Sequence, residues 1–446
     1  MLRTRRDRLA LLSLLISSLF AMVVTPTVAE PPSPPPYYAI THVKVVTGAG
    51  ASMDDATVLL ANGLIESVGK NVKVPGDARV IDGKGLSLFP GMIDALTNLA
   101  QKQEEPSGDN RNRAPVITGP EDRPQTTPWV NAADELTDDA RIEKWRKAGF
   151  TAAITSPENG IFAGQAALIN LSGQPGSEAV IATPVAQRLN LSGEEAFRSF
   201  PGSLMGTISY IKQTFLDVDH YTKVKAIYAK DPVGRVRPEF DRTLEPLETA
   251  VAQKTPFLMP ANLGREIDRA LTLKNTVNVN AIIYGGQGAY DRVDALRTAA
   301  VPVFVNLNWP KEEKNRDPEG ETPLRTLIHR KLAPTTPGAL NKAGVKFAFY
   351  SGGLATTSEI FENVRAAIDN GLTNEGALAA LSSNPATILG LSRNASAPSK
   401  RARWRTSCSP ATGRGPTASR CAPCSWMESS SRSARTKVLP IRPHPT

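Results

Sequence analysis

The chain has 446 residues, 41% of them hydrophobic and 21% charged, a composition that indicates a globular protein with a core of ordinary size. Its formal net charge of +9 invites a nucleic acid or an acidic surface as a partner. Of the 52 Lys and Arg residues, however, ten lie in residues 395–446, which hold one of the 43 acidic residues, so the rest of the chain has 42 of each sign. This balance argues against a nucleic-acid partner.

Residues 1–29 have the composition of a secretory signal peptide. Four arginines within the first eight residues precede an apolar run from Leu9 to Val24, and Thr27-Val28-Ala29 provides a small-residue cleavage site. The apolar run is short for a bilayer span, and no later segment is apolar enough to provide one. We therefore expect an exported protein, periplasmic or extracellular, with no stable membrane span after cleavage. Residues 30–37 follow as a proline-rich, extended linker.

Residues 38–89 have the pattern of β-strands. Strands are predicted at Tyr38–Val46, Thr57–Leu60 and Leu64–Gly69, and the last two are separated by Asn62-Gly63. Asn-Gly between two apolar runs predicts a tight hairpin, because both central residues of a type I′ turn have positive φ. The segment is therefore predicted to be β-structure built around a hairpin.

The phrase F-P-G-M-I-D-A-L-T-N-L over residues 89–99 resembles the start of an amidohydrolase barrel. In that family a phrase of the form P-G-hydrophobic-I-D-A-H-x-H supplies two metal-ligating histidines. Here the two positions hold Leu96, which has no lone pair, and Asn98, whose neutral amide oxygen is a poor substitute for imidazole at a zinc-type site. The resemblance, of the imidazolonepropionase type, implies a (β/α)8 TIM-like barrel over residues 90–392. Residues 38–89 would then be the N-terminal half of a flanking β-sandwich, whose second half comes from the C-terminus.

The pattern from Pro90 to Leu391 fits this α/β fold, because short apolar runs alternate with amphipathic segments of helical length. Barrel strands are predicted at Phe150–Ile154, Phe257–Pro260, Ala281–Tyr284, Val301–Val305 and Lys346–Tyr350. Helices are predicted from the cap Thr137-Asp138-Asp139 to Gly149, and at 266–274, 290–300, 359–370 and 372–391. The glycine- and proline-rich residues 103–129 are predicted to be a long loop over the barrel mouth.

The resemblance also implies where the remaining metal ligands should be. Barrel enzymes keep their chemistry at the C-terminal ends of the strands. Aligned by phrase, the fifth-strand histidine falls on Pro260, the sixth-strand histidine on Gly285 and the last-strand aspartate on Gly352. Together with Leu96 and Asn98, these make five ligand positions without a zinc-type donor. The family would use zinc or another divalent metal, whereas we expect no metal and assign no catalytic residue here.

Polar residues near the predicted strand ends are candidates for a ligand pocket. They are Asn98, Glu158, Asn262, Tyr284, Gln287 and Ser351. The glycine-punctuated phrase from Glu158 to Leu171 either cradles a ligand through backbone N–H groups or makes a tight turn into an added strand, and we favour the turn. Asp94, which matches the barrel acid of the family, is predicted to make a structural hydrogen bond.

Residues 393–446 form a basic tail that contains all three cysteines, Cys408, Cys421 and Cys424. A Cys-x-x-Cys pair ordinarily indicates a redox or metal motif. We interpret the tail instead as a frameshifted translation. Reading each codon one base early, with synonymous codons chosen freely, converts Cys421–Lys437 into V-R-T-V-F-V-D-G-V-V-I-E-I-R-K-D-E, which resembles the last strands of an amidohydrolase. The tail as written is therefore expected to be disordered, and the sandwich to be incomplete, with exposed apolar edges.

Three functional interpretations stay open. By family, the protein would hydrolyse carbon–nitrogen bonds other than peptide bonds with metal-activated water. The interpretation that we favour is a metal-free, catalytically impaired binding or partner subunit, with a metal-bearing amidohydrolase relative or a small molecule as its partner. The alternatives are an active hydrolase with a metal-independent site that uses acids such as Glu158, and a structural or sugar-binding barrel.

Overall fold

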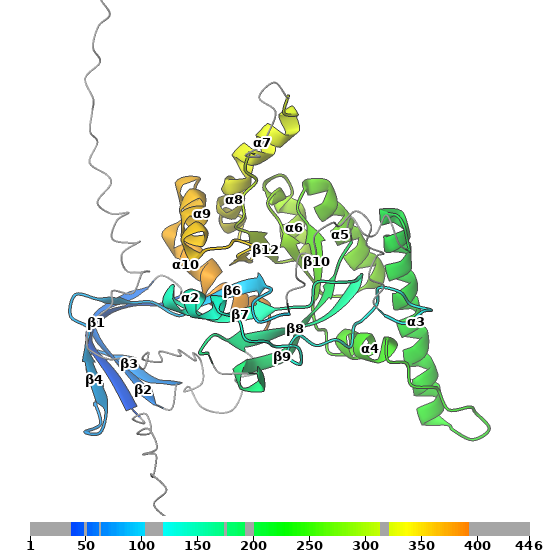
Figure 1. Cartoon of the computed structure of the whole chain (residues 1–446), viewed down its shortest axis with the longest axis horizontal. Coiled ribbons are helices and arrows are strands. Elements are labelled where there is room, and N and C mark those ends of the chain that lie inside the picture. Colours follow the sequence, from blue (N-terminus) through cyan, green and yellow to red (C-terminus); the bar gives the residue numbers. More distant parts are fainter. Residues whose placement is uncertain are drawn as a thin grey trace, which may run out of the picture.

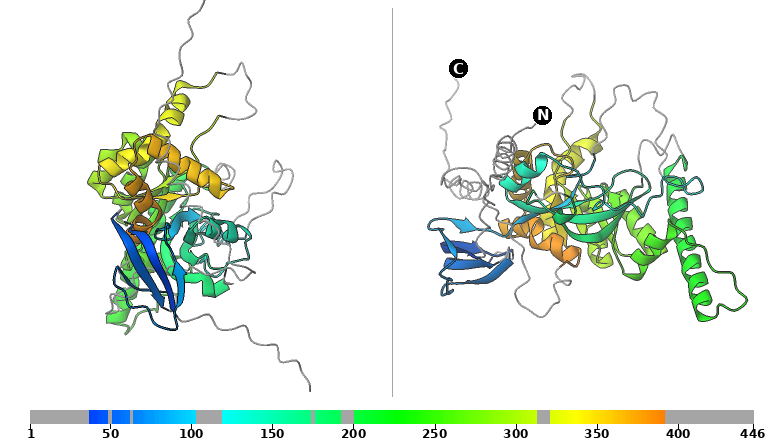
Figure 2. Two further views of the ribbon diagram at one scale, coloured as in Figure 1. Left: turned by 90° about the vertical axis from the view of Figure 1, so that its left-hand side faces the viewer. Right: turned by 60° about the horizontal axis from the view of Figure 1, so that its bottom comes forward.

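The computed structural model describes residues 37–48, 51–61, 64–102, 119–173, 176–191, 200–312 and 321–391. The chain forms a small β-sheet and an eight-stranded barrel sheet that is partly covered by helices (Figure 1). The small sheet and helix α3 (Leu204–Lys230) lie at opposite ends of the molecule (Figure 2). Within the described ranges, no helix has the length and apolar character that a bilayer crossing requires. The predicted signal peptide, the Asn62-Gly63 turn and the C-terminal tail lie outside these ranges.

The small sheet has five strands, β1 (Tyr37–Val46), β2 (Ser52–Ala61), β3 (Leu64–Gly69), β4 (Arg79–Asp82) and β5 (Ser87–Leu88). Their order is β3-β2-β1-β4, and β5 also pairs with β1. Strands β2 and β3 are antiparallel with Ala61 opposite Leu64, as expected for the predicted hairpin. Among the described residues, strand β4 pairs only with β1 and is an edge strand, and its four residues are all exposed, including Val80 and Ile81. The predicted exposed apolar edge is therefore present among the described residues.

The barrel sheet runs in the order β13-β12-β11-β10-β9-β8-β7-β6. Its strands are β6 (Met92–Thr97), β7 (Phe150–Thr155), β8 (Phe162–Asn170), β9 (Val180–Leu189), β10 (Phe257–Ala261), β11 (Ala281–Gly285), β12 (Val303–Asn306) and β13 (Phe347–Tyr350). Strand β13 lies beside β6, and the backbone N–H of Ser351 donates to Asp94 Oδ1 at 3.0 Å across this seam. The sheet is therefore nearly closed, which confirms the predicted TIM-like barrel with a flanking β-domain.

One strand departs from the predicted run of parallel β/α units. Strand β8 is antiparallel to both β7 and β9, whereas β9 to β13 and the pair β6–β7 are parallel. The connection from Thr155 to Phe162 is too short for the crossover that a parallel neighbour needs. The predicted turn into an added strand after Glu158 is confirmed, and the added strand is β8 itself.

Helices pack against the barrel sheet both on the side of β6 and β7 and on the side of β10 to β13 (Figure 1). They are α2 (Arg141–Lys147), α3, α4 (Leu244–Ala252), α5 (Gly264–Val277), α6 (Val293–Ala299), α7 (Leu324–Leu332), α8 (Thr336–Lys342), α9 (Thr357–Asp369), α10 (Asn374–Leu381) and α11 (Ser383–Ile388). Short 3-10 turns lie at η1 (Gly176–Ala179), η3 (Ala289–Asp291) and η4 (Ala333–Thr335). Helix α2 begins later than the predicted cap. Asp139 precedes it and accepts the backbone N–H of Arg141 at 2.8 Å, so the carboxylate still serves the helix start.

Apolar side chains form two layers on the two faces of the barrel strands. In β10, Phe257 and Met259 pack outward against the helices, while Leu258 packs inward with Ile282 of β11 and Phe304 of β12. This is the alternation expected of strands that are buried on both faces. The inward layer fills the barrel axis and leaves the strand ends as the place for a site.

Candidate functional site

The first metal-ligand position is part of the packed barrel interior. Leu96 is 4% exposed and packs with the inward layer, and Pro260 on β10 is paired with Tyr284 on β11. Asn98 does carry an oxygen, but its Oδ1 accepts Arg141 Nη1 at 3.0 Å and its carbonyl oxygen accepts Nη2 at 3.1 Å. A guanidinium cation therefore occupies the oxygens that a metal would need.

The last-strand position is closed by backbone conformation. Gly352 has φ +59°, and a Cβ at this position would overlap the side-chain amide of Asn306. Asn306 Oδ1 accepts the N–H of Asn308 at 2.7 Å, so this amide is itself held in place. Gly285, with φ +107°, likewise has a conformation that side chains rarely adopt. Within the described part of the chain, no cluster of three or more His, Cys, Asp or Glu side chains is placed to hold a metal ion. These residues do not fit the metal centre of the fold family.

Asp94 forms a buried hydrogen-bonded cluster beneath the mouth. Its Oδ2 accepts Trp145 Nε1 at 3.2 Å and its Oδ1 accepts the N–H of Ser351. Burial raises the pKa of Asp94 to about 6, although both hydrogen bonds oppose the rise. The predicted structural hydrogen bond is present, and it ties β6 to α2 and to the end of β13. Ser351, one of the predicted pocket residues, thus lies in the barrel seam.

A cavity of about 520 Å³ opens at the C-terminal ends of β6 and β7. Its lining residues are Asn98, Gln101, Lys102, Thr127, Val130, Glu135, Ser156, Pro157, Glu158, Asn159 and Ala163. Two of the predicted pocket residues, Asn98 and Glu158, therefore share one cavity, although 60 positions separate them in the chain. Thr127 belongs to the predicted mouth loop, so part of that loop does line the site.

The remaining predicted pocket residues are not in the cavity lining, and they make hydrogen bonds between the loops at the strand ends. Gln287 donates through its backbone N–H to Asn262 Oδ1 at 3.1 Å, and its Nε2 donates to the carbonyl of Asn308 at 2.6 Å. It thereby joins the loops that follow β10, β11 and β12. Tyr284 donates its hydroxyl to Asn190 Oδ1 at 2.8 Å, at the end of β9. Their role in ligand binding stays a prediction.

Arg188, near the end of β9, is the residue that sequence reasoning missed. It is paired with Leu258, whose side chain points into the barrel, so Arg188 points inward too. Its Nη1 donates to Ser156 Oγ at 3.0 Å, and its Cζ lies 5.2 Å from the centre of the Tyr284 ring. The available signal was a single charge inside the apolar run Val185-Ala186-Gln187-Arg188-Leu189. Burial lowers the pKa of Arg188, but Tyr284 and Glu158 raise it further, so the guanidinium stays charged.

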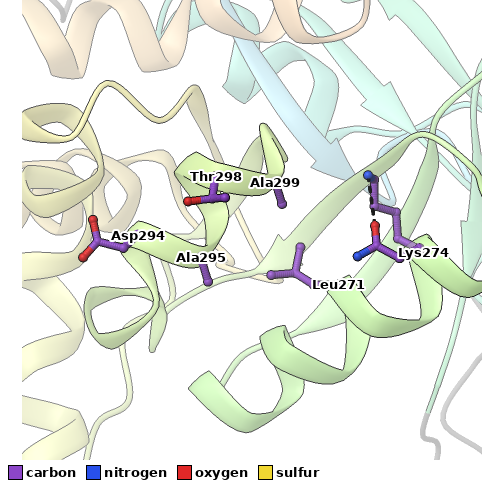
Figure 3. A pocket seen from close by; sticks show the side chains of 7 residues that line it. Leu271, Lys274, Asp294, Ala295, Thr298 and Ala299 are labelled. Atoms are coloured by element: carbon purple, nitrogen blue, oxygen red, sulfur yellow. Dashed lines mark hydrogen bonds between the residues drawn. The ribbon is translucent and has the colours of Figure 1, made fainter.

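A second hollow lies between α5 and α6, on the outer face of the barrel (Figure 3). Leu271, Ala295 and Ala299 line it together with Lys274, whose Nζ donates to Asn275 Oδ1 at 3.4 Å. It is lined by helix residues and lies away from the strand ends where barrel chemistry is found. We assign no function to it.

One of the solved structures that this chain resembles has the same architecture. An amidohydrolase from Thermotoga maritima MSB8 superposes with a TM-score of 0.65 and 25% sequence identity, over 79% of this chain and 89% of that one. A Xaa-Pro dipeptidase with methionine bound in its active site gives a TM-score of 0.48 at 14% identity, over 80% and 89% of the two chains. No family model matches the chain.

Among curated proteins, dihydropyrimidinase-related protein 5 of human and rat is 38% identical over 61 residues, which is 13% of this chain. The match spans 11% of those relatives, so it says nothing of their whole activity. The barrel, the flanking sheet and the Thermotoga likeness define a TIM-like barrel protein of the hydrolase type. The chain belongs to the amidohydrolase superfamily.

Proposed function

We propose that this chain is a metal-free, catalytically impaired amidohydrolase of the imidazolonepropionase type that acts as a binding or partner subunit, with a small-molecule site at the barrel mouth. The observation that carries the proposal is the state of the five ligand positions. Leu96 is part of the packed interior, Asn98 is bound by Arg141, and Gly352 abuts Asn306. Pro260 and Gly285 offer no side-chain donor. A cavity nevertheless remains at the mouth, which supports a binding role.

The metal-independent hydrolase is less well supported by the cavity residues. Ser156 Oγ accepts a hydrogen bond from Arg188, and a guanidinium cannot act as a general base. The three histidines of the described ranges, His42, His220 and His329, lie in β1, α3 and α7, away from the cavity lining. Glu135 and Glu158 are the acids that line the cavity with Ser156, and the Glu158 carboxylate faces Arg188.

Elemental mass spectrometry on the purified exported protein tests the proposal. We expect less than about 0.1 divalent metal ion per chain after dialysis against trace zinc, because no position supplies imidazole or carboxylate. Hydrolysis of a panel of amide, hydantoin and lactam substrates should stay at the background rate. As a matched control, L96H/N98H should also stay metal-poor, since three of the five positions remain without a donor. One or two ions per wild-type chain, with turnover that a chelator abolishes, would overturn the proposal.

The partner half of the proposal has its own experiment. Affinity purification of the tagged exported chain, at native expression level, should co-purify a histidine-rich amidohydrolase relative in a fixed ratio if the chain is a partner subunit. A chain that is recovered alone but binds a small molecule supports the binding role instead. Turnover that survives chelation would favour the metal-independent hydrolase.

A further inference from the structure

We propose that Arg188 is the cationic centre of the barrel mouth and that it binds the carboxylate of a small anionic ligand, in a site formed with Ser156, Glu158 and Tyr284. The inference rests on the proposed binding function and deepens it, because it names the chemical class of the ligand. Its basis is a largely buried guanidinium whose Nε–H has no hydrogen-bond partner among the described residues.

The position of Arg188 makes it part of the mouth. Strand β9 is parallel to β10, so its last residues lie at the same barrel end as Ser156 and Glu158, which follow β7. Both of these residues line the 520 Å³ cavity, and Arg188 Nη1 contacts each of them. Arg188 lies next to these two lining residues, whereas the cation in the lining itself is Lys102. A carboxylate ligand in the cavity would therefore reach Arg188 by displacing the Glu158 carboxylate.

The guanidinium of Arg188 is incompletely hydrogen-bonded by the described residues. Its side chain is 12% exposed, and its one ion pair there is with Glu158 Oε1 at 3.5 Å. That distance is long for a charge-assisted hydrogen bond, and the Glu158 side chain is 51% exposed. The Nε–H of Arg188 is buried and has no hydrogen-bond partner among the described residues. Buried guanidinium groups are normally paired and fully hydrogen-bonded, so this group can gain from an added oxyanion.

The neighbours of Arg188 hold it in place for this role. Tyr284 lies under the guanidinium, and the Tyr284 hydroxyl is fixed by Asn190. Asn190 Nδ2 also donates to the carbonyls of Glu158 and Gly160 at 2.7 and 2.8 Å, which fixes the turn after β7. A planar guanidinium that is held rigidly over an aromatic ring loses little entropy when it binds a carboxylate.

The Glu158 carboxylate occupies the position at which we expect the ligand carboxylate to bind. This half-exposed carboxylate lies on the cavity side of Arg188 and is a weak competitor for the same donor. A ligand carboxylate that makes a shorter contact with Arg188 would displace it. This predicts that removal of the Glu158 charge strengthens binding of a carboxylate, whereas removal of the Arg188 charge removes the preference for a carboxylate over a neutral ligand.

Isothermal titration calorimetry with benzoate and benzamide tests the inference on the full chain. The two probes have the same shape and differ in charge. Wild type should bind benzoate at least about tenfold more tightly than benzamide, the factor expected for one charge-assisted hydrogen bond.

R188Q should bind both probes alike. E158Q should bind benzoate about twofold to fivefold more tightly than wild type, as expected for loss of a half-exposed ion pair. R292Q, which removes a surface arginine paired with Asp268, is the matched control and should leave both affinities unchanged.

The outcomes separate this inference from the proposed function. Equal affinity of wild type for benzoate and benzamide, or weaker benzoate binding by E158Q, would overturn the role of Arg188 even if the protein is metal-free. Bound metal together with chelator-sensitive benzoate binding would overturn the proposed function instead. If R188Q does not fold, the test uses R188K and E158Q instead. R188K keeps the positive charge, so it should still bind benzoate more tightly than benzamide. Its affinity for benzoate should be lower than that of wild type, because the planar guanidinium is lost.

Discussion

Asp94 is a buried residue that links strands β6 and β13 across the barrel seam. Its two carboxylate oxygens accept from Ser351 at the end of β13 and from Trp145 of α2, so one side chain joins three elements. The cost is burial of a carboxylate without a cation beside it, and this raises its pKa to about 6 from an ordinary value of 3.8. A group with a raised folded-state pKa of this kind binds its proton more tightly in the native state than in the unfolded state.

This shift fixes the sign of a pH dependence. Between about pH 4 and pH 6 the native state holds the Asp94 proton and the unfolded state does not, so the free energy of unfolding falls as the pH rises through this range. The shift from 3.8 to about 6 corresponds to about 3 kcal/mol. In D94N this contribution disappears. We therefore expect urea unfolding at pH 4, 5, 6 and 7 to show that the free energy of unfolding of D94N, relative to that of wild type, increases by about 3 kcal/mol as the pH rises.

Asp139 supplies the matched control with the opposite sign. Burial raises its pKa, but hydrogen bonds from Arg141 and from the N–H of Ala100 lower it further, so the pKa ends below its ordinary value. Asp139 therefore contributes stability above its unfolded pKa, and this stability is lost as the pH falls. The free energy of unfolding of D139N should lie furthest below that of wild type at neutral pH, and the difference should be smallest at acid pH. Parallel pH profiles for D94N and D139N would contradict both assignments.

At the residue scale, the sequence predicts which metal-ligand positions lack a donor better than it predicts which residues form a new site. Leu96 and Gly352 could be recognised as unsuitable ligands because a missing donor is a property of the residue type alone. Arg188 could not be recognised, since its importance depends on Ser156 and Tyr284, which lie far from it in the chain and meet it only through the register of the barrel strands. The contact between Arg141 and Asn98 is equally non-local.

At the scale of elements, apolar runs predict strands but not their direction. The predicted runs at Phe150, Phe257, Ala281 and Phe347 all lie in barrel strands. Strand β8 is also an apolar run, yet it is antiparallel to its neighbours. The short turn after Thr155 leaves no length for the crossover helix that a parallel strand needs. Connection length was the signal available for this departure. The closing helical phrase divides into α10 and α11, where Ser382 ends the first helix.

The free edge β4 makes an element-scale prediction about association. Val80 and Ile81 are 56% and 44% exposed on a strand that has no outer neighbour among the described residues. Such an edge promotes pairing with another chain, and lysine on an edge opposes it. V80K/I81K should therefore reduce self-association in sedimentation velocity, while the free energy of unfolding changes by less than about 0.5 kcal/mol.

The same substitution at a covered position provides the contrast. Val58 in β2 is 1% exposed, and V58K should destabilise the protein by several kcal/mol, since it buries an unpaired ammonium group. If V80K/I81K associates as strongly as wild type, the β4 edge is not the contact. If it destabilises the chain as V58K does, another segment covers that edge.

At the scale of the whole molecule, the small sheet is the part whose sequence and architecture disagree. Its described strands bury one apolar cluster around Val43, Val58 and Leu60, and they leave β4 open. A sandwich needs a second layer, which the amidohydrolase likeness implies from the C-terminal residues. Residues 393–446 as written are basic and rich in Ser and Arg, a composition unsuited to buried strands.

We therefore expect genomic sequencing around codon 394 to reveal an inserted or lost base relative to close relatives. The frame-corrected chain should add the missing strands, raise the free energy of unfolding and associate less. It should also change the effect of V80K/I81K from neutral to destabilising by more than about 1 kcal/mol, because the edge would then be paired and its side chains covered. A single intact frame through codon 446 would contradict the frameshift. In that case the open edge belongs to the native protein, and the partner subunit becomes the natural candidate to cover it.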